Sequence, residues 1–165
     1  MSEFDTLYSL AGVSIAMAGF AAIVVVFRRR DRGGWHPADA DRFNGMLLHA
    51  MAAAFFCFLP TALWIFFTAP GRIWAIGSVA MALQVLAHAW TIFRLPTSDG
   101  WVRVFLVLPL LVVALQVMNV LGIGYSAEFR PYLAGVLWHL FQAGLLFVML
   151  IWVRESDLAD PDLAG

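Results

Sequence analysis

A long apolar segment followed at once by a cluster of arginines constrains the fold of this chain more than any other feature. Residues 6–27 form an apolar to weakly polar stretch, which as a helix is long enough to cross the ~30 Å hydrocarbon core of a bilayer. Four arginines follow within five residues, at positions 28, 29, 30 and 32. Because positive residues collect on the cytoplasmic side, this junction predicts a retained first span with its N-terminus outside.

Four further apolar segments are long enough to span a membrane. They cover residues 44–68, 73–93, 104–123 and 132–153, and short stretches containing Pro, Gly or Ser separate them. Only 13% of the residues are charged, against ~25% in a typical soluble domain. The sequence therefore predicts an all-α integral membrane protein with five transmembrane helices. They form a single domain over residues 1–154, and an acidic cytoplasmic tail follows over residues 155–165.

The distribution of arginine supports one orientation of these spans. With the N-terminus outside, the cytoplasmic side carries Arg28, Arg29, Arg30, Arg32, Arg42, Arg94, Arg103 and Arg154, and the outer side carries Arg72 and Arg130. This asymmetry predicts a cytoplasmic C-terminus. The Gly- and Ala-rich first segment and the arginine-rich loop after it resemble those of small bacterial membrane proteins, a likeness that implies no activity. We therefore expect a multi-pass protein of the bacterial inner (cytoplasmic) membrane.

The composition excludes several classes of function. The chain has no lysine, so Schiff-base chemistry on a lysine side chain is impossible. A net charge of -1 argues against a nucleic-acid partner, and the single cysteine, Cys57, excludes an intrachain disulfide. The sequence also lacks the motifs of covalent haem attachment, zinc proteases, P-loop ATPases and serine hydrolases. We predict no enzymatic activity, no catalytic residue and no metal site.

Apart from serine and threonine hydroxyls, the polar side chains inside the predicted spans include histidines and amides, and none is a carboxylate or an arginine. Three pairs at helical spacing each place two polar side chains on one face of a helix: Gln84 with His88, Gln116 with Asn119, and His139 with Gln142. Such faces should point away from lipid. Interhelical hydrogen bonds that fix the rotation of each helix are the plainest role for them.

Two prolines and two histidines lie at informative positions in the spans. Pro60 cannot donate to the carbonyl of Phe56, and Pro109 leaves the carbonyl of Phe105 in the same way, so both helices should bend there. His49 and His88 lie at matching depths from the cytoplasmic ends of the second and third spans. The two imidazoles could therefore face one another.

Three hypotheses for the function follow. The first is a non-enzymatic oligomeric channel or small-solute permeation path, in which the polar interior comprises Gln84, Gln116, Asn119, His139 and Gln142. The second is a haem b electron-transfer subunit with His49 and His88 as axial ligands. The third is an accessory subunit of a larger membrane complex, which predicts exposed small residues at Gly12, Ala16 and Ala18. Besides the lipid bilayer, the expected partner is a second copy of the chain or another membrane subunit.

Overall fold

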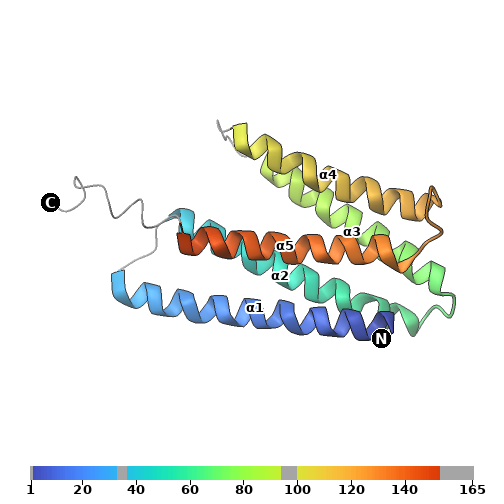
Figure 1. Ribbon diagram of the computed structural model, residues 1–165, viewed down its shortest axis with the longest axis horizontal. Helices are drawn as coiled ribbons and strands as arrows, with labels where there is room; N and C mark the ends of the chain where they lie inside the picture. Colours follow the sequence, from blue (N-terminus) through green and yellow to red (C-terminus); the bar gives the residue numbers. More distant parts are fainter. Residues whose placement is uncertain (1, 33–36, 94–99, 153–165) are drawn as a thin grey trace. The chain divides into compact units, whose positions relative to one another are not determined.

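The chain folds into helices throughout the part that the structure describes. The computed structural model describes residues 2–32, 37–93 and 100–152, and these residues form five helices and no strand. The helices are α1 (Glu3–Arg32), α2 (Pro37–Trp64), α3 (Pro70–Phe93), α4 (Gly100–Leu121) and α5 (Phe129–Trp152) (Figure 1). The predicted all-helical fold is confirmed.

The helices extend beyond the predicted spans at several ends. α1 continues through the arginine cluster to Arg32, because arginine is a good helix former. α2 begins at Pro37, seven residues before the predicted span. Proline suits the first position of a helix, since its fixed φ matches and its missing N–H would have no intrahelical partner. The first and second helices are therefore longer than the apolar pattern indicates.

Four of the helices are long and apolar enough to cross a membrane. The candidate spans are Glu3–Val26, Ala40–Trp64, Pro70–Thr91 and Phe129–Ile151. In α4 the described apolar segment, Leu108–Leu121, is shorter than a full span. Four candidate spans indicate a membrane-embedded protein, and a fifth span in α4 stays a prediction.

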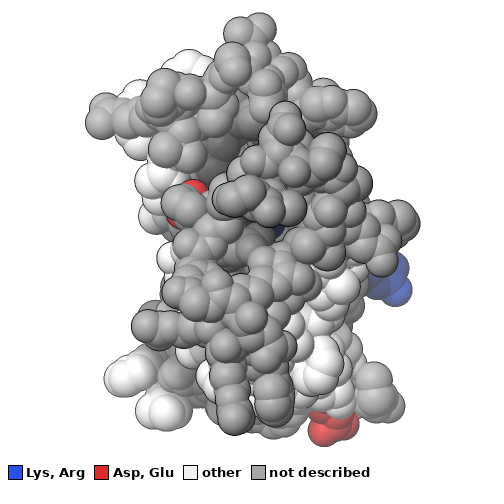
Figure 2. Space-filling view, turned by 90° about the vertical axis from the view of Figure 1, so that its left-hand side faces the viewer, with Lys and Arg blue, Asp and Glu red and all other residues white. Residues whose placement is uncertain are grey.

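The surfaces of the helices have the character expected in lipid. Every helix exposes large hydrophobic side chains, among them Val26, Phe55, Leu83, Leu111 and Phe141. Figure 2 shows that uncharged residues make up most of the described surface visible from that side. An aqueous solvent would oppose so much exposed apolar surface, whereas hydrocarbon does not. Burial thus agrees with the hydropathy of the helices.

The contacts divide the chain into two compact units. The first unit comprises residues 1–8 and 56–138, and the second comprises residues 9–55 and 139–165. α3 and α4 belong wholly to the first unit, where they pack against each other (Figure 1). α1, α2 and α5 contribute residues to both units.

The second unit is held together by small side chains from three helices. Its core consists of Ala21 on α1, Met46 and Ala50 on α2, and Ala143 on α5, all at most 1% exposed. A Cβ atom on Gly45 would lie 3.1 Å from Leu146 Cδ1, so the backbone of α2 closely approaches a side chain of α5. Close approach of backbones at small residues is the usual way that helices associate in lipid.

The first unit contains a cluster of aromatic rings around Trp74 of α3. The indole lies 6.1 Å from the ring of Phe4, 5.2 Å from Phe129 and 5.5 Å from Tyr132, measured between ring centroids. Such tilted arrangements are favourable for aromatic pairs. The cluster joins the beginnings of α1, α3 and α5 within this unit.

Candidate functional site

The predicted polar residues fall into both units. Gln84 and His88 lie on α3 and Gln116 and Asn119 on α4, all in the first unit. The second unit contains His49 on α2 together with His139 and Gln142 on α5. Gln116, Asn119, His49 and His139 are buried, whereas Gln84, His88 and Gln142 are half-buried.

Asn119 joins α3, α4 and the loop between α4 and α5. Its Nδ2 donates to Ser78 Oγ at 3.0 Å and to the carbonyl of Glu128 at 3.0 Å, and its Oδ1 accepts a hydrogen bond from the Glu128 N–H at 2.8 Å. Both donors of the amide and its carbonyl oxygen are thus used. The role of Asn119 in this structure is to hold a connection in place.

The same loop begins with a standard helix-ending motif. Gly122 has φ +72°, and the Ile123 N–H donates to the carbonyl of Met118 at 2.9 Å, the long bond of a Schellman motif. Glycine suits this left-handed position because it has no Cβ atom. α4 therefore ends at Leu121, and the chain turns toward α5.

Gln116 binds the first turns of α5. Its Nε2 donates to the carbonyl of Pro131 at 2.7 Å. A Cβ atom on Gly135 would lie 2.9 Å from this nitrogen and closer still to Met81 Sδ of α3, so glycine allows both side chains to reach α5. Within the described residues, Gln116 Oε1 and Gln84 Oε1 are buried and accept no hydrogen bond. The permeation-path hypothesis for these residues stays a prediction.

Tyr132 supplies the hydrogen bond that Pro60 cannot donate. The hydroxyl of this fully buried side chain donates to the carbonyl of Phe56, four residues before Pro60 on α2. The sequence predicted that this carbonyl would be freed, but it did not indicate the donor. Because a buried carbonyl needs a donor, the freed Phe56 carbonyl was the signal in the sequence that a hydroxyl such as that of Tyr132 should lie nearby.

The second unit brings His49 together with His139. Their Nδ1 atoms lie 3.1 Å apart, and the ring centroids are 5.4 Å apart at an interplanar angle of 38°. The side chains are 4% and 1% exposed. As a hydrogen bond, this contact requires a proton on one Nδ1 and a lone pair on the other. The sequence did not predict this pair, and the haem hypothesis, which uses His49 with His88, stays a prediction.

Two of the three small residues of α1 that the accessory-subunit hypothesis names are exposed. Gly12 and Ala16 are exposed, Ala18 is half-buried, and no atom lies within 4 Å of a Cβ built on Gly12 or Gly19. α1 is also the least buried of the four candidate spans. The partner that this hypothesis needs stays a prediction.

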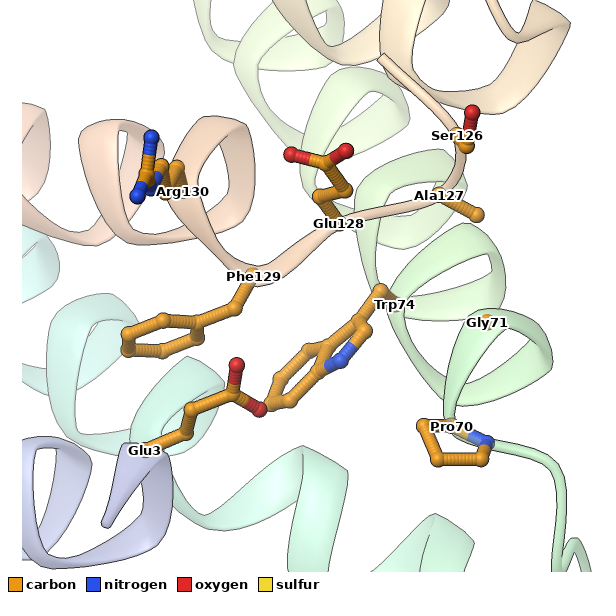
Figure 3. Close-up of a pocket in the computed structure, with 9 residues that line it drawn as sticks. All are labelled: Glu3, Pro70, Gly71, Trp74, Ser126, Ala127, Glu128, Phe129 and Arg130. Atoms are coloured by element: carbon orange, nitrogen blue, oxygen red, sulfur yellow. The ribbon is translucent and has the colours of Figure 1, made fainter.

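An open pocket lies beside the Trp74 cluster in the first unit. It has a volume of about 670 Å³, and its lining comprises Glu3, Pro70, Gly71, Trp74, Ser126, Ala127, Glu128, Phe129 and Arg130 (Figure 3). The beginnings of α1, α3 and α5 and the loop before α5 supply these residues. The sequence did not single out this pocket, because its residues come from three separate parts of the chain.

The pocket combines carboxylates with aromatic rings. Figure 3 shows the Glu3 carboxylate directed toward the Trp74 indole, with the Phe129 ring nearby, while the Arg130 guanidinium points away from the indole. Glu3 and Glu128 are both exposed, and among the described residues neither forms an ion pair. Both precede or begin a helix, where the helix dipole favours a negative charge. The Glu128 carboxylate, like the Arg130 guanidinium, points away from the indole, so Glu3 is the carboxylate that places negative charge beside the aromatic surface.

The fold and the site together define a helical, membrane-embedded protein with an open pocket beside the beginnings of α1, α3 and α5. No protein-family model matches the chain, and no curated protein and no solved structure is similar to it.

Proposed function

We propose that this chain is a non-enzymatic, multi-pass membrane protein that binds a small organic cation in the pocket beside Trp74. The observation that carries the proposal is the Glu3 carboxylate beside the Trp74 and Phe129 rings, in a cavity whose lining also includes Glu128. A volume of about 670 Å³ falls within the range of roughly 300–1,000 Å³ that is usual for small-molecule sites. An organic cation satisfies both parts of the lining, since carboxylates attract its charge and aromatic rings contact its alkyl groups.

The polar interior of the first unit supports binding in preference to open conduction. Asn119 uses its amide to hold Ser78 and Glu128, and Gln116 holds Pro131. Trp74 is 4% exposed and packs against Tyr132. Two of the lining residues, Trp74 and Glu128, are thus held by neighbouring side chains. A permeation path through this unit would require Asn119, Gln116 and Trp74 to separate from these partners.

The proposal needs no catalytic step. No histidine lines the pocket, and Ser126 is the one hydroxyl among the lining residues. A serine nucleophile requires an adjacent base to activate it. With the topology predicted from the arginines, the pocket opens on the outer side of a bacterial inner membrane, where it would meet solutes before they enter the cell.

Removing either carboxylate is expected to weaken cation binding. Tetraethylammonium would be titrated into the full chain in maltoside micelles, by calorimetry, with no choline lipid present to compete. We expect Glu3→Gln and Glu128→Gln each to raise the Kd about fivefold, equivalent to the loss of roughly 1 kcal/mol from a partly exposed charge contact.

Asp41→Asn provides the matched control, because Asp41 is an exposed carboxylate that does not line the pocket. It should leave the Kd unchanged. Wild-type protein that shows no saturable binding, or pocket variants that bind as tightly as the control, would mean that Glu3 and Glu128 merely stabilise helix ends.

A further inference from the structure

The pocket beside Trp74 lies where three candidate membrane spans begin. Its lining includes Glu3, Pro70 and Phe129, which are the first residues of α1, α3 and α5 and of the candidate spans in those helices. When these segments are embedded in a bilayer, their first residues lie near the boundary between hydrocarbon and water. The lipid headgroups occupy that boundary, so the pocket lies at their level.

The connection between α2 and α3, next to the pocket, is apolar and exposed. Ile65 and Phe66 follow the end of α2 and are 79% and 77% exposed, more than any other large hydrophobic side chain in the described part of the chain. Pro70, which lines the pocket, comes shortly after them. Large apolar side chains exposed in this way favour contact with lipid over contact with water. The surroundings of the pocket therefore suit a ligand that comes from the bilayer.

The lining offers charged groups of both signs at separate places. Figure 3 shows the Glu3 carboxylate directed toward the Trp74 indole, whereas the Arg130 guanidinium points away from it. Glu3 belongs to α1 and Arg130 to α5, and among the described residues Arg130 forms no ion pair. Together with Glu128, the lining contains two carboxylates and one guanidinium, a net charge of -1. A ligand with a cationic end and an anionic end finds a partner for each in this pocket.

From these observations we infer that the pocket binds the headgroup of a zwitterionic phospholipid, which carries both an ammonium and a phosphate. The inference rests on the proposed function and names the source of the organic cation. The ammonium lies beside Glu3 and the rings of Trp74 and Phe129, where charge and cation–π attraction act together. The phosphate pairs with Arg130, because a guanidinium can bind phosphate through two parallel hydrogen bonds. An anionic phospholipid without an ammonium gains nothing from Glu3.

The lipid is tested by native mass spectrometry of the full chain, released from maltoside micelles that contain equal amounts of phosphatidylethanolamine and phosphatidylglycerol. We expect one retained phosphatidylethanolamine per chain, in at least about fivefold excess over phosphatidylglycerol. Glu3→Gln should bring this ratio close to one, and Arg130→Gln should lower the retained phosphatidylethanolamine about fivefold. Arg72→Gln is the matched control, because Arg72 is an exposed arginine in the first turn of α3 that does not line the pocket. It should retain lipid as the wild type does.

Calorimetry with soluble ligands separates this inference from the proposed function. Glycerophosphocholine carries the ammonium and the phosphate without acyl chains, whereas choline carries the ammonium alone. The wild type should bind glycerophosphocholine about fivefold more tightly than choline, and Arg130→Gln should bind the two equally.

Three results would overturn the inference in different ways. Choline binding without a gain from the phosphate, or equal retention of the two lipids, would overturn it and leave the cation site standing. Tighter binding of glycerophosphocholine with no retained lipid would mean that the pocket takes a soluble zwitterion. The absence of binding by choline, glycerophosphocholine and lipid would contradict the proposed function as well.

Discussion

Replacing Asn119 with alanine is expected to lower the free energy of unfolding by about 3 kcal/mol. The substitution removes three side-chain hydrogen bonds, one to Ser78 Oγ and two to the backbone of Glu128. Each is worth roughly 0.5–1.5 kcal/mol, and a buried group left without its partner costs more. The Ser78 hydroxyl is fully buried, so it would lose its interhelical donor. Unfolding in mixed maltoside and SDS micelles, followed by tryptophan fluorescence, measures the change.

Asn44→Ala is the matched control for this prediction. Asn44 is the same residue type on α2, but its side chain is exposed, so its loss should change the unfolding free energy by less than about 0.5 kcal/mol. If the two variants were equally stable, the connection between α4 and α5 would not depend on the Asn119 amide.

A Gly77→Ala substitution is expected to destabilise the first unit by about 2 kcal/mol through overpacking. A Cβ atom at this position would lie 2.7 Å from Tyr132 Cε2 and 3.3 Å from two neighbouring ring atoms. The ring cannot easily turn away, because its hydroxyl binds the Phe56 carbonyl and the ring contacts Trp74 in a tilted arrangement. The backbone of α3 would have to move instead. The same unfolding measurement detects the loss.

The control for Gly77 is a glycine with open space around it. No atom lies within 4 Å of a Cβ on Gly12, and alanine is the better helix former by about 1 kcal/mol. Gly12→Ala should therefore leave stability unchanged or raise it. Loss of stability in Gly12→Ala that matched the loss in Gly77→Ala would show that the Tyr132 contact is not the cause.

The helices could be predicted from the sequence, but their ends could not. Long apolar segments set the number and order of the helices, which the structure confirms. The start of α2 at Pro37 lies outside any apolar pattern, since a helix can include polar residues that hydropathy does not mark. As a result, His49 lies nearer the middle of its helix than the predicted span places it. That shift is one reason why the pairing with His139 could not be anticipated.

Partners of polar groups were harder to predict than the groups themselves. Pro60 indicated that the Phe56 carbonyl would need a donor, because proline has no N–H. Which of many hydroxyls would supply it depends on how α5 packs, and the structure gives Tyr132. Asn119 was recognised as an interior amide, yet its main contacts are with a loop. Helical periodicity identifies a face, whereas the contacts of that face depend on tertiary structure.

The pocket was the least predictable feature of the chain. Glu3 and Glu128 are separated by most of the sequence and belong to no motif. They come together because α1 and α5 begin at the same aromatic cluster in the first unit, where Trp74 contacts both Phe4 and Phe129. Only the packing of these rings places two carboxylates around one cavity.

The most direct test of the proposed function compares two ligands of the same shape and different charge. Choline and its uncharged carbon isostere, 3,3-dimethylbutan-1-ol, would each be titrated into the wild-type protein in maltoside micelles by calorimetry. Carboxylates beside aromatic rings should favour the cation, so the account predicts saturable choline binding at least about tenfold tighter than that of the isostere. Equal affinities, or no binding of choline, would contradict an organic-cation site.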